Sequence, residues 1–377
     1  NLFKPIGDKV LDNPFLIWIS KGDLGVDLFF VISGFLIGTI LFKELKKNNK
    51  IDFKKFYTRR FLRLMPVYIF SMIIGIYFLH GTPPGNWRMA WSNILYINNY
   101  IRESYMGWTW SLAIEEQFYT ICPLFLLGLF FYAKTNRMKT TLFASTVVLM
   151  LLVRGAVISY LDLSAPVLDL VMGDETTYAY WDYVYIMPHT RLNALLIGVF
   201  CAFIYINYRD QVRSVSECWW FQLIQITAFL LMCWLATDWI YTIPKTYIGD
   251  LPAWGRFLYL VTFHDLFALA TATLFLGVLT GKGFVYATVG KVLESKFWFP
   301  IAQLSYSWYL VHMIVMDLIY PHSSQWLYDQ FGLETGFWLN GIMASMAGLF
   351  LSYVLFVFIE KPTMDLRRSD MVKRFHG

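Results

Sequence analysis

The chain has 377 residues, of which 57% are hydrophobic and 15% charged, and its mean hydropathy is +0.50. Soluble domains carry roughly 25% charged residues, so this composition excludes an ordinary soluble globule and predicts a membrane protein. The four cysteines lie far apart, with neither a CxxC pair nor a Cys/His ligand spacing, so we expect no disulfide framework and no metal site. No long polar stretch divides the chain, which predicts one integral membrane domain over residues 1–377, ending in a basic tail at 361–377.

Nine segments are apolar over the roughly 17 to 25 residues that a helix needs to cross a ~30 Å hydrocarbon core. They lie at residues 24–42, 60–79, 109–132, 140–161, 190–207, 219–240, 256–279, 300–319 and 337–359. We therefore predict an all-α fold, a polytopic bundle of about nine transmembrane helices.

The connecting segments alternate in positive charge, which predicts their orientation. One alternate set holds 22 Lys/Arg and the other holds six. Positive charge is retained on the cytoplasmic side during insertion, so the carboxyl end should be cytoplasmic and the amino end external. Because an external start needs something to carry it across, we expect one further span upstream of Asn1 and ten helices in the intact protein.

Polar side chains recur on one face of the third predicted span. Ser111, Glu115 and Tyr119 are spaced i, i+4 and i+8, which places them on the same side of a helix. Glu115 would lie roughly 10 Å below the outer surface, at 1.5 Å of rise per residue. Ionisable groups at membrane depth are costly and mark functional sites by default.

His312 forms a similar face in the eighth predicted span and lies at a similar depth, while Asp27 and Arg191 lie near the same outer surface. These residues predict a polar site in the outer half of the membrane. The alternative is that they only join helices through polar bonds, each contributing ~0.6 kcal/mol.

Two further patterns have structural as well as functional interpretations. Arg59, Arg60 and Arg63 begin a helix at the inner surface, where guanidinium groups can bind phosphates or simply anchor the chain to anionic lipid. Gly34 and Gly38 form a GxxxG motif, which favours close helix packing.

Six motifs, taken together and in this order, resemble the acyltransferase-3 family. They are GVDLFFVISGFLI (25–37), FYTRRFLRLMP (56–66), WTWSLAIEEQFY (108–119), PHTRLNALLIG (188–198), SYSWYLVH (305–312) and EKP (360–362). The resemblance implies a ten-helix enzyme, in a bacterial inner membrane, that takes an acyl group, often acetyl, from cytoplasmic acyl-coenzyme A. The acceptor would be a hydroxyl of an extracytoplasmic or lipid-linked carbohydrate. The expected partners are the bilayer and this acceptor, and no nucleic acid.

The resemblance also implies roles for individual residues. Arg60 and Arg63, with Arg59 beside them, would bind the phosphates of the donor. The catalytic candidates are Glu115, Tyr119 and His312, and the other residues expected in the reaction chamber are Asp27, Ser33, Ser111 and Arg191.

Two features of the chain depart from the family pattern. The family carries an essential histidine on its first helix, as base or acyl carrier, and no matching run precedes Asn1. Asn193 stands where many relatives have an acid.

Two other classes fit part of this pattern. A transporter of glycan or small acid would also place charges at the midplane, and release of coenzyme A thiol on addition of acceptor separates an enzyme from a carrier. A non-catalytic relative that only recognises lipid or partners would account for the absent histidine. A histidine-containing span encoded upstream would argue against that third class.

Overall fold

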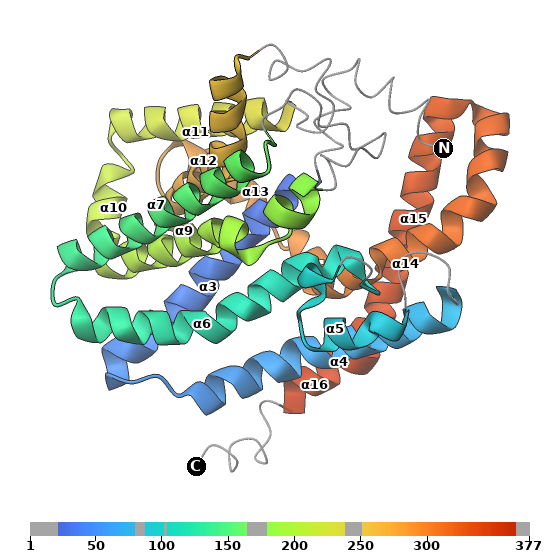
Figure 1. Ribbon diagram of the computed structural model, residues 1–377, viewed down its shortest axis with the longest axis horizontal. Coiled ribbons are helices and arrows are strands. Elements are labelled where there is room, and N and C mark those ends of the chain that lie inside the picture. The colour runs from blue at the N-terminus through green and yellow to red at the C-terminus, as the bar shows by residue number, and fades with distance from the viewer. Residues whose placement is uncertain (1–21, 80–86, 102–103, 164–178, 238–250, 367–377) are drawn as a thin grey trace. The chain divides into compact units, whose positions relative to one another are not determined.

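A computed structural model describes residues 22–79, 87–101, 104–163, 179–237 and 251–366 (Figure 1). These residues are helical or in connecting turns, and none of them forms a β-strand. The chain divides into two compact units, each made of two separate pieces of sequence. Unit 1 is Asn1–Ile51 with Ile114–Glu294, and unit 2 is Asp52–Ala113 with Ser295–Gly377. That the whole chain acts as one domain remains a prediction.

Unit 1 is built from long helices with short helical turns between them. Its elements are α3 (Leu24–Asn48), all but the first turn of α6 (Trp110–Tyr132), α7 (Asn136–Tyr160), the π-helical turn η4 (Trp181–Tyr185), α9 (Pro188–Asn207), α10 (Arg209–Val215), α11 (Trp219–Thr237), α12 (Ala253–Thr280), the π-helical turn η6 (Tyr286–Gly290) and α13 (Lys291–Leu293).

Unit 2 combines three long helices with several short ones. Its elements are α4 (Phe53–Leu79), η1 (Trp87–Met89), α5 (Ala90–Ile94), η2 (Asn98–Tyr100), η3 (Gly107–Thr109), the first turn of α6, α14 (Trp298–Phe331), α15 (Leu333–Leu355), the π-helical turn η7 (Phe356–Glu360) and α16 (Lys361–Leu366).

Eight of the described helices are long and apolar enough to cross a membrane, and they correspond to eight of the nine predicted spans. The remaining prediction, 300–319, lies within α14, a 34-residue helix that is not among the eight. Large apolar side chains such as Phe350 and Phe358, each 71% exposed, cover the outer faces of the helices. Exposed apolar surface on this scale requires lipid contact. The prediction of an all-α, polytopic membrane fold is confirmed.

Close packing of α3 against α9 organises unit 1. A methyl group at Gly34 would collide with the backbone carbonyl of Leu195, and one at Gly198 would collide with the carbonyl of Val31. At Gly38 a Cβ would lie 3.0 Å from that of Ala202. The two helices therefore approach backbone to backbone, as the GxxxG motif predicted, because small residues meet from both sides.

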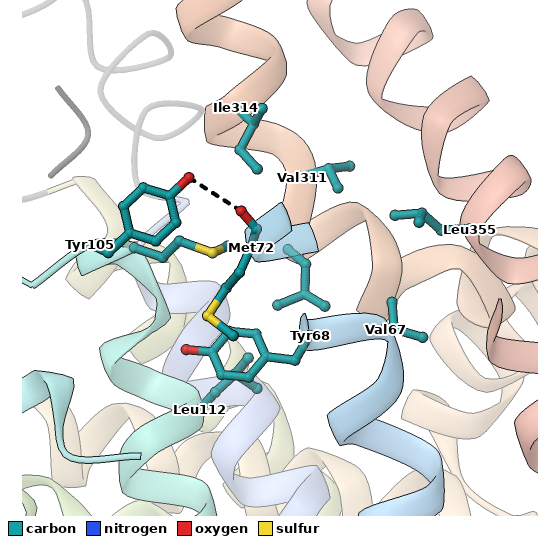
Figure 2. Close-up of a cluster of buried hydrophobic side chains, with 10 residues drawn as sticks. Val67, Tyr68, Met72, Tyr105, Leu112, Val311, Ile314 and Leu355 are labelled. Carbon is teal, nitrogen blue, oxygen red and sulfur yellow. Dashed lines mark hydrogen bonds between the residues drawn. The ribbon is translucent and has the colours of Figure 1, made fainter. Parts of the chain in front are cut away.

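The apolar core of unit 2 forms where α4, α14 and α15 meet (Figure 2). Val67 and Met72 of α4 pack against Val311 of α14, and Leu355 of α15 joins the same cluster. The Tyr105 hydroxyl donates to the Met72 carbonyl at 3.4 Å. These contacts join four separate segments of unit 2 around one core.

The hairpin of α14 and α15 closes unit 2 at its carboxyl side, with the two helices side by side in Figure 1. Gly332 forms the turn with φ +78°, a left-handed conformation that favours glycine. Asn340 of α15 is 1% exposed, donates to Ser324 at 2.6 Å and accepts from Ser323 at 2.5 Å. This bonding satisfies polar groups of α14 beyond Pro321, so the helix continues well past the predicted end at residue 319.

Candidate active site

A buried cluster of ionisable groups from three helices lies in unit 1. Asp27 of α3 forms an ion pair with Arg191 of α9, with 3.0 Å between Oδ1 and Nη2. His264 of α12 approaches the other carboxylate oxygen, with 2.8 Å between Nδ1 and Oδ2. All three residues are at most 3% exposed. Asp27 and Arg191 were each predicted to lie near the outer surface of the membrane, and the sequence analysis did not single out His264.

The packing of α3 and α9 explains why Asp27 and Arg191 meet. Both residues lie in the first turn of their helix, and the helices run in the same direction from that end. A carboxylate is favoured at a helix amino end and a cation is not. Two groups compensate the unfavourable position of Arg191. One is the carboxylate of Asp27, and the other is the ring of Tyr185, whose centroid lies 4.8 Å from the guanidinium carbon.

A second buried ion pair lies beside the first. Arg154 of α7 pairs with Asp265 of α12, and it also donates to the carbonyls of Thr190, at 2.8 Å from Nε, and Val261, at 2.6 Å from Nη1. Asn193 donates its side-chain amide to Asp265 Oδ1 at 2.5 Å. Arg154 thus joins α7, α9 and α12. The acid beside Asn193 is Asp265, which α12 supplies.

The π-helical turn Trp181–Tyr185 covers this cluster with aromatic rings. Tyr185 stacks on Trp181 with 4.5 Å between ring centroids and meets the His264 ring edge-on at 5.8 Å. Burial raises the pKa of Tyr180 to about 12 and that of Tyr185 well above its usual value of 10. Both phenols therefore stay protonated and can donate hydrogen bonds. Isolated π-helical turns occur frequently at functional sites.

A third polar group in unit 1 surrounds Glu115. The hydroxyls of Ser33 on α3 and Tyr119 on α6 both donate to Glu115 Oε1, and they also contact each other. The three residues are between 2% and 5% exposed. The structure therefore brings together three predicted site residues. A carboxylate with two hydroxyl donors is an acceptor-only group held in a fixed orientation, which suits proton transfer or charge stabilisation.

Ser111 and His312 lie in unit 2. Ser111 bonds to the hydroxyl of Tyr309 at 2.7 Å, and that hydroxyl donates to the carbonyl of Trp108 at 2.5 Å. His312 Nδ1 lies 2.6 Å from the carbonyl of Tyr309 in its own helix. A lone imidazole can make this contact for a purely structural reason, without a role in a functional site. His312 and Ser111 keep their site roles as predictions.

The three arginines lie near the start of α4 in unit 2, with Arg59 and Arg63 exposed and Arg60 partly buried. Arg63 is within electrostatic range of Glu360, the acid of the EKP motif. Glu360 is 4% exposed and accepts from Ser307 Oγ at 2.7 Å. Exposed guanidinium groups at this end of the helix remain accessible to a phosphate-bearing ligand.

Sequence reasoning missed Arg154, His264 and Asp265. All three lie inside predicted spans, at 140–161 and 256–279, and are ionisable. The rule that singled out Glu115, that charges at membrane depth are rarely incidental, would have found them too. The described residues contain no group of three or more His, Cys, Asp or Glu that could hold a metal ion.

These features define the class: a polytopic helical membrane protein whose helices enclose ionisable side chains. Residues 3–358 match the family described as the acyltransferase domain, and the chain belongs to this family. The resemblance inferred from the six motifs is therefore confirmed.

Curated relatives share parts of the chain. It is 27% identical over 385 residues to O-acetyltransferase OatA of Staphylococcus aureus, an alignment covering 94% of this chain and 57% of the relative. It is 36% identical over 138 residues to peptidoglycan O-acetyltransferase OatA of Listeria monocytogenes, covering 32% and 22%. It is 25% identical over 338 residues to nose resistant to fluoxetine protein 6 of Caenorhabditis elegans, covering 80% and 39%.

The chain thus spans somewhat more than half the length of the Staphylococcus relative that it matches. No solved structure matches it.

Proposed function

We propose that this protein is a membrane O-acyltransferase that moves an acyl group, most simply acetyl, from acyl-coenzyme A to a hydroxyl of a carbohydrate. Membership of the acyltransferase domain family supports the reaction class. Two bacterial relatives named as O-acetyltransferases, one of them acting on peptidoglycan, support a cell-envelope carbohydrate as acceptor. The observation that carries the proposal is the buried Glu115 carboxylate, fixed by two hydroxyl donors among membrane-spanning helices.

The donor is proposed to bind from the cytoplasm, at Arg60 and Arg63. The segment 43–63 holds nine Lys/Arg, which favours a cytoplasmic position in a bacterial inner membrane, and it places the carboxyl end on the same side. Guanidinium groups bind phosphates through paired hydrogen bonds. The nucleotide would be held there, while the thioester reaches the acceptor deeper in the protein.

The reaction needs a group that removes a proton and a group that stabilises charge. The acceptor hydroxyl oxygen attacks the thioester carbonyl, the carbon–sulfur bond breaks, and the hydroxyl proton finally resides on the released thiol. Glu115 can stabilise a cationic proton carrier or relay the proton itself, because hydrogen bonds from Ser33 and Tyr119 fix the orientation of its carboxylate.

Replacement of Glu115 by Gln in the full-length protein tests the proposal. It keeps the size of the side chain and removes the charge, so we expect acyl transfer to fall by about 100-fold or more, with expression and unfolding temperature unchanged. Glu116→Gln, one residue further along the same helix, is the matched control and should retain activity. Thiol release and acylated acceptor are both measured. Unchanged transfer by Glu115→Gln excludes Glu115 from the mechanism, and a wild-type protein that releases no thiol refutes the reaction.

A further inference from the structure

His264 has a polar atom that no described residue engages. Its Nδ1 lies 2.8 Å from Asp27 Oδ2, whereas Nε2 is buried and has no hydrogen-bond partner among the described residues. The residue is 3% exposed. A buried polar atom without a partner costs about 1–3 kcal/mol. Packing alone would favour a side chain without that second nitrogen, so a structural role does not account for the choice of histidine.

The same cluster contains a second polar atom that the described residues leave without a hydrogen bond. The hydroxyl of Tyr180, a residue 1% exposed, also lacks a partner within the described part of the chain. Tyr180 acts electrostatically on the same groups, Arg191, Arg154 and Asp27. One buried cluster therefore holds two polar groups, an imidazole nitrogen and a phenol, that are available to a ligand with hydroxyl or carbonyl groups.

The contact with Asp27 determines what His264 can do. A carboxylate beside Nδ1 accepts a hydrogen bond from Nδ1–H and so keeps the proton on that nitrogen. Nε2 then carries the lone pair. The same carboxylate stabilises the imidazolium that forms when Nε2 takes up a proton. A histidine oriented in this way is a proton acceptor, as in other Asp–His arrangements that activate hydroxyl groups.

His264 lies among charged groups on several helices. Asp27 pairs with Arg191, and Asp265 pairs with Arg154. Among the described residues, the titratable or charged groups around the cluster are Asp23 before α3, Asp27 on α3, Arg191 on α9, Arg154 on α7, Asp265 on α12 itself and Tyr180 and Tyr185 at η4. Helix α11, which also packs on α12, has no charged residue.

We propose that His264 is a further catalytic residue of the acyl transfer, oriented by Asp27 as a positioning residue. This inference rests on the proposed function. His264 Nε2 accepts the proton of the acceptor hydroxyl as its oxygen attacks the carbonyl carbon of the acyl thioester. When the carbon–sulfur bond breaks, the same Nε2 returns the proton to the departing thiolate. The products are the ester and the free thiol, and no other reactant is needed.

The sharpest variant is His264→Asn, because an asparagine amide can still donate to Asp27 but has no counterpart of Nε2. We expect kcat to fall by about 100-fold or more, with KM for the thioester within about 3-fold and an unchanged unfolding temperature. The acidic limb of the wild-type pH–rate profile, where protonated imidazole cannot accept a proton, should disappear. His322→Asn, at an exposed histidine of α14, is the control and should retain both rate and profile.

Asp27→Asn tests the positioning role, and we expect a fall in kcat of about 10- to 100-fold. Nitrogen NMR of labelled histidine gives a readout that needs no activity: wild-type His264 should carry its proton on Nδ1, and Asp27→Asn should change that tautomer.

Three outcomes separate the two hypotheses. Retention of rate and acidic limb in His264→Asn overturns the inference while leaving the acyltransferase intact. A proton on Nε2 in the wild type overturns it even if the protein proves inactive with acetyl-coenzyme A. Absence of thiol release from the wild type counts against the proposed function instead, and therefore against the reaction assigned to His264.

Discussion

Substituting Gly34 by alanine should separate α3 from α9 and weaken unit 1. The new Cβ would collide with the carbonyl oxygen of Leu195, which is backbone and cannot rotate away. Ordinary contacts between carbon and carbonyl oxygen are about 3.3 Å or longer, so the helices must move apart by roughly 1 Å. Overpacking of this kind typically costs about 1–3 kcal/mol.

The purified protein in detergent would be heated, and the apparent unfolding temperature measured by intrinsic fluorescence. We expect a decrease on the order of 5 °C for Gly34→Ala. Gly128→Ala in α6 is the matched control, because nothing lies within 4 Å of its added Cβ. Gly198→Ala should resemble Gly34→Ala, and the double variant should lose less than the two single losses combined, since one separation relieves both collisions. Equal unfolding temperatures for Gly34→Ala and Gly128→Ala would refute backbone contact between α3 and α9.

Two further changes test the ion pair and the arginines. Arg154→Met should lower the free energy of unfolding by about 3–5 kcal/mol, because it leaves Asp265 buried and uncompensated. Combining Arg154→Met with Asp265→Leu should recover most of this loss. If the double variant does not regain the unfolding temperature, the pairing of Arg154 with Asp265 is wrong. The double variant Arg60→Ala with Arg63→Ala should raise the Kd of a non-reactive coenzyme A analogue by at least about 10-fold and leave acceptor binding unchanged. If titration gives equal Kd values for variant and wild type, these arginines only anchor the chain to lipid.

Features that depend on local periodicity and charge were predictable from the sequence. Apolar length identified the spans because a helix must cover a fixed thickness of hydrocarbon. The GxxxG spacing identified the close-packed face of α3, since Gly34 and Gly38 lie one turn apart. The shared face of Glu115 and Tyr119 followed from helical geometry in the same way, and the structure adds Ser33 as their common partner.

Which helix faces which is encoded by packing between distant segments, and periodicity does not reveal it. Ser111 lies on the same predicted face as Glu115, yet its partner is Tyr309 of α14. The cluster around Asp27 and His264 joins residues 237 positions apart. No motif links them, because the contact depends on how α12 packs on α3, and this packing is a property of the assembled bundle.

The π-helical turn η7 lets one continuous helical segment face two directions. Along α15 the buried positions Gly348, Ser352 and Leu355 recur with the α-helical interval, which would next turn residue 359 inward. The wider turn accommodates one extra residue, so Glu360 is buried instead. The segment thereby changes register by one residue, a rotation of about 100°. An otherwise lipid-adapted helix can in this way direct a carboxylate into protein without a break in the chain.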